Sequence, residues 1–272
     1  MEVTLIAMTD AVMPSETSEL VGEYCTAEHV CDHAARTCTS EELEPMLEYE
    51  DTYLSWGHEG LGALRSALSS GHTSVAEHAV YTFEIRGVSR ALTHQLVRHR
   101  IASYSQQSQR YVIMGDFGYV IPESICKNPD ALDDYINLMG KIQYMYEEFA
   151  SEEGYHIPEE DVRYILPNAC TSNIVVTMNA RELLHFFSLR CCARAQWEIR
   201  ELATKMLAIC KEVSPTIFED AGPSCVRDGF CREQRSCGRA PKLERVMEIM
   251  DEIDCEASIR DEQRTAEREC HR

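Results

Sequence analysis

The densest group of side chains able to do chemistry lies in one run, QLVRHRIASYSQQSQRY, which begins at Gln95 and ends at Tyr111. The run holds three arginines and a histidine together with serines, glutamines and tyrosines. Guanidinium groups make bidentate, charge-assisted contacts with phosphate, while serine, glutamine and backbone amides can hydrogen-bond the edge of a planar heterocycle. A solvated, salt-bridged helix end is the alternative, and it explains one arginine better than three. The run therefore indicates nucleotide binding.

A second basic stretch, NARELLHFFSLR, begins at Asn179. Arg181 and His185 are four residues apart, which places them on one helix face near the positive end of the helix, where a pyrophosphate is favoured. Asn179 suits the N-cap, and Glu182 three residues later completes a capping-box pattern. The alternative for the pair is a surface arginine and a buried histidine. The stretch predicts a strand, a cap and a helix in succession.

Apolar periodicity indicates the elements that must position these two stretches. Residues 102–110 are polar and rich in small side chains, which favours a ligand-facing loop. The expected fold class is α+β, with a strand-containing core flanked by helices. Strands are expected over residues 3–8, 80–85 and 173–178. Helices are expected over residues 18–36, 41–70, 89–98, 130–149 and 195–213. Two further helices are expected, one that begins at residue 158 and one in the charged tail after residue 242.

Composition limits the partners of this chain. Its 272 residues carry 26 Lys and Arg against 46 Asp and Glu, and the net charge of −20 repels a nucleic-acid backbone. A local arginine cluster can still hold a small anion. No apolar run approaches the roughly 20 residues of a membrane span, and the start has no basic leader of a secretory signal. We therefore expect a cytoplasmic protein that binds neither nucleic acid nor membrane.

The cysteines indicate a reducing compartment. There are 13 of them, an odd number, and they fit small buried side chains better than a disulfide framework. Cys225, Cys231 and Cys237 recur with five residues between neighbours, whereas zinc sites show tighter pairs and need a fourth ligand. We expect no metal, and the preferred interpretation is a solvent-side loop with reduced thiols.

The arginine-rich run also resembles a known signature. Arg98-His99-Arg100, followed after seven residues by Ser108, is similar to the motif of flavin-dependent thymidylate synthases. The resemblance covers residues 70–220. One departure is Ser105-Gln106, where the family often has Asn-Glu, so that a neutral amide replaces a carboxylate. The other matching blocks are TSVAEH from Thr73, VRYILP from Val162, NARELLHFFSLR from Asn179 and AQWEIR from Ala195, with a weaker echo, AARTC, from Ala34.

The resemblance implies a reaction and an assembly. The family methylates dUMP to dTMP with FAD, NADPH and 5,10-methylenetetrahydrofolate, and the flavin carries the hydride. The implied fold is that of the flavin-dependent thymidylate synthases, in a homotetramer whose FAD sites cross subunit boundaries. Residues 1–220 would form the synthase domain, and residues 221–272 a cysteine-containing loop with a C-terminal helix.

The resemblance further implies residue roles. Arg190 is the expected catalytic residue, since in the family this arginine faces the uracil and a fixed cation there stabilises developing charge. Ser108 is expected to bind rather than attack, because no histidine base is recognisable beside it. The implied FAD positions are His78, Val80, Arg98, His99, Arg100, Gln106, Asn179, Arg181 and His185. The implied dUMP positions are Gln95, Arg98, Gln106, Gln107, Ser108, Gln109, Arg110, Arg163 and Arg190.

Two other functions compete with this interpretation. The second class of thymidylate synthase uses a cysteine nucleophile, but no cysteine here sits in that class's recognisable surroundings, and Cys191 and Cys192 are expected to be buried helix residues. A nucleotide-sensing or RNA-binding module could grip phosphate and stack bases with the first basic run alone. The second basic stretch, far along the chain, argues against such a module.

Overall fold

The computed structural model describes residues 1–10, 26–40, 61–242 and Met247. The expected helices over residues 18–36 and 41–70 are therefore seen only in their later parts. The expected tail helix, apart from Met247, lies outside the described residues. Within the described part, a sheet flanked by helices confirms the α+β class.

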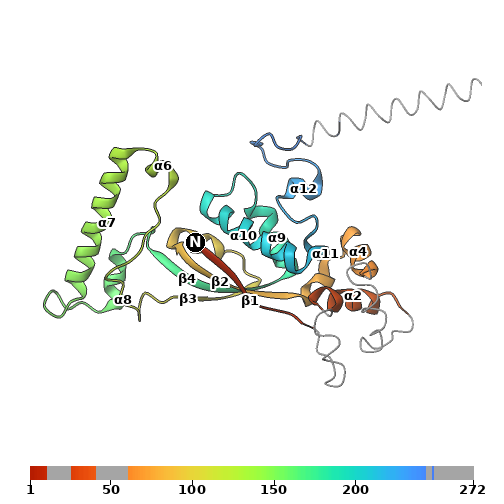
Figure 1. Ribbon diagram of the computed structural model, residues 1–272, viewed down its shortest axis with the longest axis horizontal. Coiled ribbons are helices and arrows are strands. Elements are labelled where there is room, and N and C mark those ends of the chain that lie inside the picture. The colour runs from red at the N-terminus through yellow and green to blue at the C-terminus, as the bar shows by residue number, and fades with distance from the viewer. Residues whose placement is uncertain (11–25, 41–60, 243–246, 248–272) are drawn as a thin grey trace, which may run out of the picture.

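A four-stranded antiparallel sheet occupies the centre of the molecule, with the strand order β1–β2–β4–β3 (Figure 1). The two central strands pair Val80 with Asn179 at one end and Ser89 with Thr171 at the other. Their register shifts between Ile85 and Val88, where Gly87 adopts a φ of +67° that only glycine takes up easily. The strands are β1 Glu2–Met8, β2 Val80–Ser89, β3 Ala102–Gln106 and β4 Thr171–Asn179.

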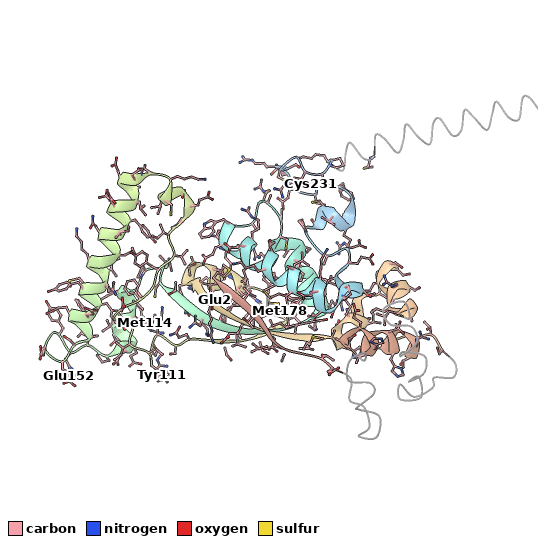
Figure 2. The ribbon with its side chains drawn as sticks, in the orientation of Figure 1. Glu2, Tyr111, Met114, Glu152, Met178 and Cys231 are labelled. Carbon is pink, nitrogen blue, oxygen red and sulfur yellow. The ribbon has the colours of Figure 1, made fainter. Side chains whose placement is uncertain are left out.

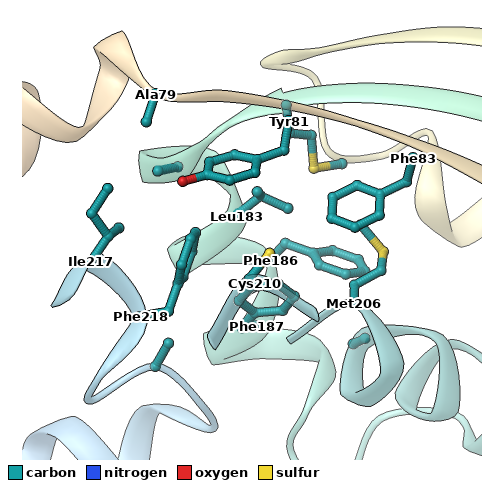
Figure 3. Packing of buried hydrophobic residues seen from close by; sticks show 14 of the residues in the cluster. Ala79, Tyr81, Phe83, Leu183, Phe186, Phe187, Met206, Cys210, Ile217 and Phe218 are labelled. Carbon is teal, nitrogen blue, oxygen red and sulfur yellow. The ribbon is translucent and has the colours of Figure 1, made fainter. Parts of the chain in front are cut away.

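The main core lies between the central strands and the helices that cover one face of the sheet. Alternate residues of β2, such as Tyr81 and Phe83, are fully buried, as period-two apolar patterning predicts. They lie among Phe186, Phe187 and neighbouring aromatic and aliphatic side chains (Figure 3). The buried hydroxyl of Tyr81 donates to Ser214 Oγ at 2.7 Å, so its polar end is satisfied.

One buried carboxylate fixes where the first site-bearing helix begins. Ser89 caps α5, because its hydroxyl accepts from the Leu92 amide at 3.0 Å. The same hydroxyl donates to Glu198 of α10, and the Ser89 amide donates to the second oxygen of Glu198 at 2.8 Å. The helices over this face are α5 Arg90–Leu96, α9 Ala180–Arg190 and α10 Trp197–Val213.

Helices from both halves of the chain meet at one end of the sheet. The buried carboxylate of Glu28 accepts the Ile217 amide at 2.9 Å, although Ile217 follows it by 189 residues. Asp32, also buried, accepts the Leu64 amide at 2.8 Å. The elements here are α2 Ala27–Thr37, α4 Gly62–Ser69, the 3₁₀ helix η3 Thr73–His78, α11 Pro215–Phe218 and α12 Ser224–Asp228.

A separate helical arm stands at the other end of the sheet, on the left of Figure 1. It has its own small core around Met139, Tyr146 and Val162. The helix expected from residue 158 is a single turn, because Leu166 precedes a proline and therefore favours an extended backbone. The elements of the arm are α6 Glu123–Cys126, α7 Pro129–Ala150, α8 Glu159–Val162 and η4 Arg163–Ile165.

The expected loop over residues 102–110 was wrong in its first half, because residues 102–106 form β3. Backbone pairing with β4 supplies the stability that the polar side chains do not indicate, and an edge strand tolerates polar residues. The segment after Gln106 is irregular, as expected. Across the described ranges, no helix is both long and apolar enough to cross a bilayer.

Candidate active site

His99 is buried against α9, where its ring contacts a residue near each end of the helix, and its exposed fraction is 5%. Its Nδ1 is 3.2 Å from Oε1 of Glu182, near the start of the helix. Its Nε2 is 3.1 Å from Nε of Arg190, the last residue of the helix. The first basic run and the second stretch are therefore in contact, and His99 is the residue that joins them.

Short-range hydrogen bonds hold both sides of this junction. The chain turns after α5, and the hydroxyl of Tyr104 on β3 contacts the carbonyl oxygens of Leu96 and His99 at 2.8 and 2.7 Å. Asn179 caps α9 as expected, since its side-chain oxygen accepts the Glu182 amide at 2.9 Å. The Glu182 carboxylate does not close a capping box, because it is directed to His99.

Burial governs the charges at the junction. Burial, and then the nearby Arg190 and His185, lower the pKa of His99 to about 4, so the imidazole is neutral at neutral pH. Burial raises the pKa of Glu182, and the neighbouring His185 partly opposes this shift. The ring of His185 lies 6.0 Å from that of His99, while Phe186 contacts His99 edge-on at 4.9 Å.

A pocket of about 880 Å³ opens beside the junction. Arg181 and His185 both line it, so these residues do share one face of α9, as their spacing predicts. Arg181 forms an ion pair with Glu77 of η3. The wall also carries Arg65 and Arg227 together with the acidic Glu219 and Asp220, and Arg65 pairs with Glu219 at 3.1 Å.

A second group of predicted residues lies toward the other end of β3. On β4, Gln106 pairs with Ile174, whereas Ala102 at the start of β3 pairs with Met178. The backbone amide of Gln107 donates to the Asn173 carbonyl at 2.9 Å. Figure 2 shows the corresponding separation between Met178 and Tyr111. At this end Arg110 pairs with Glu160 at 2.9 Å. Arg163 donates to the Glu160 carbonyl at 3.0 Å.

Comparisons with known proteins identify the family. Residues 19–216 match the family described as thymidylate synthase complementing protein. A flavin-dependent thymidylate synthase of Geobacter sulfurreducens is 50% identical over 224 residues, which are 80% of this chain and 91% of that protein. The enzyme of the same name from Clostridium tetani is 49% identical over 197 residues, 67% of this chain and 79% of its own. This chain belongs to the flavin-dependent thymidylate synthase family.

The fold agrees with that of a solved member of the family. A crystal structure of the Helicobacter pylori flavin-dependent thymidylate synthase, complexed with FAD and dUMP, superposes with a TM-score of 0.56. The two sequences are 23% identical, and the superposition covers 82% of this chain and 100% of the Helicobacter pylori chain. The likeness confirms the fold of the flavin-dependent thymidylate synthases for this chain.

The remaining residues implied by the family signature are distributed around these two groups. Arg98 and Arg100 flank the buried His99 and are exposed, as is His78, while Val80 and Gln95 are half-buried. Gln106 donates to Thr93 Oγ1 at 3.1 Å and to Ser172 Oγ at 3.2 Å, so the amide that replaces the family's carboxylate is held from two sides.

In the loop after β3, Ser108 and Gln109 have local partners. Ser108 Oγ accepts the Arg110 amide at 3.1 Å, and the Gln109 amide lies 4.0 Å from Cys170 Sγ. The role of Ser108 in binding stays a prediction.

The sequence did not predict the roles of several residues of the site. Glu182 was expected to close a capping box, and Asn-x-x-Glu carries no signal for its contact with His99. Tyr104 and Glu77 stand inside the family's motifs but were given no role. Arg65 and Arg227 line the pocket from segments that no motif marks.

The cysteine-containing segment lies against the end of α9. Arg194 pairs with Glu233 at 3.4 Å and donates to the Arg235 carbonyl at 2.8 Å. Where the structure describes the chain, no three His, Cys, Asp or Glu side chains are placed to hold a metal. Cys191 and Cys192 are half-buried in the turn after α9, which corrects the expectation of buried helix residues, because α9 ends at Arg190.

Proposed function

We propose that this chain catalyses the reductive methylation of dUMP to dTMP, with FAD as the hydride carrier. The observation that carries the proposal is the contact between Arg190 and His99, which joins the family signature to the C-terminal end of α9. Family membership supports the reaction class. The proposed co-substrates are NADPH and 5,10-methylenetetrahydrofolate, as the resemblance implies.

The pocket beside α9 fits the proposed flavin nucleotide. Its volume of about 880 Å³ lies within the range of nucleotide-sized sites. Arg181 and His185 would hold the pyrophosphate at the N-terminal half of α9, where the helix dipole favours an anion. The other proposed FAD contacts are not among the residues that line this pocket: Arg98, Arg100, His78, Val80, Asn179 and Gln106. When bound, FAD supplies hydride transfer.

Arg190 is the proposed catalytic residue. Among the described residues, its hydrogen bond to His99 is the one bond that its guanidinium makes, so the two terminal nitrogens can face a ligand. A half-buried cation beside the uracil favours the form of the ring ionised at N3 and stabilises charge that develops there. Its partner His99, which is neutral, adds no competing positive charge.

The proposed dUMP contacts divide between the two groups of residues. Arg190 and Arg98 lie at the junction, and Gln95 lies near the end of α5, whose Thr93 also contacts Gln106. Gln107 to Arg110 and Arg163 lie beyond the other end of β3. Four residues of a strand extend roughly 13 Å, which is more than one side chain spans. We therefore propose that neighbouring copies complete each site within a homotetramer.

The remaining proposals concern organisation and compartment. Residues 1–220 form the synthase domain and residues 221–272 an extension that begins beside α9. The free cysteines of the described chain fit the cytoplasm. The acidic net charge opposes the binding of polymeric nucleic acid.

The first test is the visible spectrum of the purified protein, with and without NADPH. We expect flavin absorption that NADPH bleaches, and dTMP formation when dUMP and methylenetetrahydrofolate are added. A colourless protein that FAD does not reconstitute would contradict the proposal and favour a binding module. If NADPH bleaches the bound flavin but no dTMP forms, the proposed cofactor would be supported and the proposed reaction would be refuted.

A further inference from the structure

Glu182, His99 and Arg190 form a buried chain of hydrogen bonds in which each proton can be placed. Arginine has donors and no acceptor. The Nε–H of Arg190 points at Nε2 of His99 at 3.1 Å, so Nε2 must accept and carries no proton. A neutral imidazole has one proton, which must then sit on Nδ1. Nδ1 lies 3.2 Å from Oε1 of Glu182, and the carboxylate accepts that proton's hydrogen bond.

The charges around the ring agree with this assignment. A doubly protonated imidazole would turn a donor toward the donor of Arg190 and place two cations in contact. Burial and Arg190 lower the pKa of His99 to about 4, which keeps the ring neutral. The side chains of His99 and Glu182 are only 4% and 7% exposed, so water does not readily replace either partner.

The backbone of Glu182 is fixed at the start of the helix that ends in Arg190. Its backbone amide donates to the side-chain oxygen of the cap residue Asn179 at 2.9 Å. One rigid helix therefore carries both outer members of the chain, and His99 closes the link from a separate segment. The ring of His99 therefore connects Glu182 to Arg190 through two hydrogen bonds.

We propose that Glu182 is a positioning residue, which holds His99 in its Nδ1–H tautomer and thereby aims the Arg190 guanidinium at the pyrimidine. The role of Arg190 in this statement rests on the proposed function. The tautomer does not, since it follows from the hydrogen bonds alone. A purely structural carboxylate at this position would contribute to stability and leave the tautomer of His99 and the turnover of folded enzyme unchanged.

The test begins with the ring and requires no activity. In protein labelled with ¹⁵N-histidine, long-range ¹H–¹⁵N correlation distinguishes a protonated Nδ1 from a protonated Nε2, and His99→Gln assigns the signals. We expect a protonated Nδ1 in the wild type. Glu182→Gln keeps an oxygen acceptor and should retain this tautomer, whereas Glu182→Ala should give mixed or exchanging signals. A protonated Nε2 in the wild type would overturn the proposal.

The control is Glu198→Gln, which removes the charge of a buried carboxylate that lies outside the His99 chain. Glu198 holds Ser89 and takes no part in the His99 chain. We expect Glu198→Gln to lower stability and to leave the His99 signals at their wild-type positions. If Glu198→Gln disturbed those signals as strongly as Glu182→Ala, the specific role of Glu182 would be refuted.

Steady-state dTMP formation by FAD-loaded enzyme supplies the second arm. Glu182→Ala should lower kcat by about 10- to 100-fold, as removal of a histidine's outer hydrogen-bond partner does at metal sites, with a smaller change in KM for dUMP. Glu182→Gln should retain more activity than Glu182→Ala. If Glu182→Ala does not fold, Glu182→Asp, whose shorter side chain withdraws the acceptor from Nδ1, takes its place in both arms.

The two proposals fail in different ways. Wild-type enzyme that shows the Nδ1–H tautomer but forms no dTMP would refute the reaction and leave the link between Glu182 and His99 intact. Active wild-type enzyme, with a kcat for Glu182→Ala within twofold of wild type and an unchanged tautomer, would overturn the positioning role and leave the reaction standing.

Discussion

The hydroxyl of Tyr104 lies 2.7 Å from the carbonyl oxygen of His99, and it binds the carbonyl of Leu96 as well, at 2.8 Å. Tyr104 stands on β3, whereas both carbonyls belong to the end of α5 and the turn that follows it. A single phenol therefore ties the turn that carries Arg98, His99 and Arg100 to the sheet. Burial raises the pKa of Tyr104, so it remains a neutral donor throughout the physiological range.

Tyr104→Phe tests this tie. We expect a loss of about 1 kcal/mol in the free energy of unfolding, because two carbonyls lose a half-buried donor. FAD affinity should also weaken, since the turn gains freedom. Urea unfolding and titration of flavin fluorescence measure the two effects. Tyr144→Phe is the control, because Tyr144 is 64% exposed on α7. Equal FAD affinity in Tyr104→Phe and the wild type would show that the turn needs no such support.

Arg190→Ala tests the proposed catalytic group. We expect dTMP formation to fall by about 100-fold or more, because a fixed cation at developing charge has effects of that size. FAD should still bind, since Arg181 and His185 remain in the pocket. Arg194→Ala is a matched control four residues further on, where the guanidinium pairs with Glu233. Unchanged dTMP yield in Arg190→Ala would remove Arg190 from its role.

Glu77→Gln should strengthen the binding of FAD. Glu77 occupies Arg181 in an exposed ion pair, and the neutral amide would release that guanidinium for phosphate. Exposed ion pairs are worth up to about 1 kcal/mol, so we expect a gain of up to about fivefold in affinity at low salt, which shrinks as salt is added. Glu84→Gln, which frees the exposed Arg86 on β2 far from the pocket residue Arg181, is the control. Weaker FAD binding in Glu77→Gln would show that the carboxylate itself contacts the cofactor.

The neutral His99 should make stability depend on pH. In the unfolded chain this histidine takes up a proton near its ordinary pKa of 6.5, and in the folded chain only near 4. Between these values the unfolded state binds more protons, so the free energy of unfolding falls as pH falls, by up to about 1.4 kcal/mol per pH unit from this group. Above the upper value this contribution is constant.

Urea unfolding of the wild type and of His99→Gln between pH 4 and 7 isolates this contribution. The raised pKa of Glu182 has the opposite sign, because the folded carboxyl takes up its proton first, but that carboxyl is present in both proteins. We expect a shallower loss of stability toward low pH in His99→Gln. Parallel curves for the two proteins would refute the depressed pKa.

Mixed assemblies test whether copies share a site. Arg190→Ala removes the junction's cation, and Arg110→Ala removes one from the loop beyond β3. We expect each variant alone to be inactive or strongly impaired, and co-expressed chains to regain activity in about one site in four, the fraction that receives both intact residues by random pairing. No recovery in purified mixed assemblies would place both arginines of a site in one chain.

Local sequence patterns predicted many of the helices and strands that position the site. The alternation in β2 and the cap at Asn179 define elements by themselves, and both were found where expected. The spacing of Arg181 and His185 correctly predicted a shared face, because helix periodicity is local. β3 escaped prediction, since its stability comes from the backbone of β4, some 70 residues later.

The site needed information that no local pattern carries. The Asn-x-x-Glu pattern by itself predicts that the glutamate closes a capping box. In the structure the Glu182 carboxylate instead contacts His99, 83 residues away in the sequence, in a buried environment. The division of the dUMP residues into two groups depends on the register of β3 on β4. A one-residue change in that register would leave every motif intact and move the loop.

The bond between Glu28 and the Ile217 amide has a consequence for biosynthesis. The segment that this carboxylate needs is made 189 residues after it, close to the end of the family-matched region. Until almost the whole domain has left the ribosome, α2 of a nascent chain therefore lacks this contact with α11. Such long-range closure slows folding and exposes unfinished chains to chaperones and proteases, so synthesis that stops short of residue 217 should give no stable fragment.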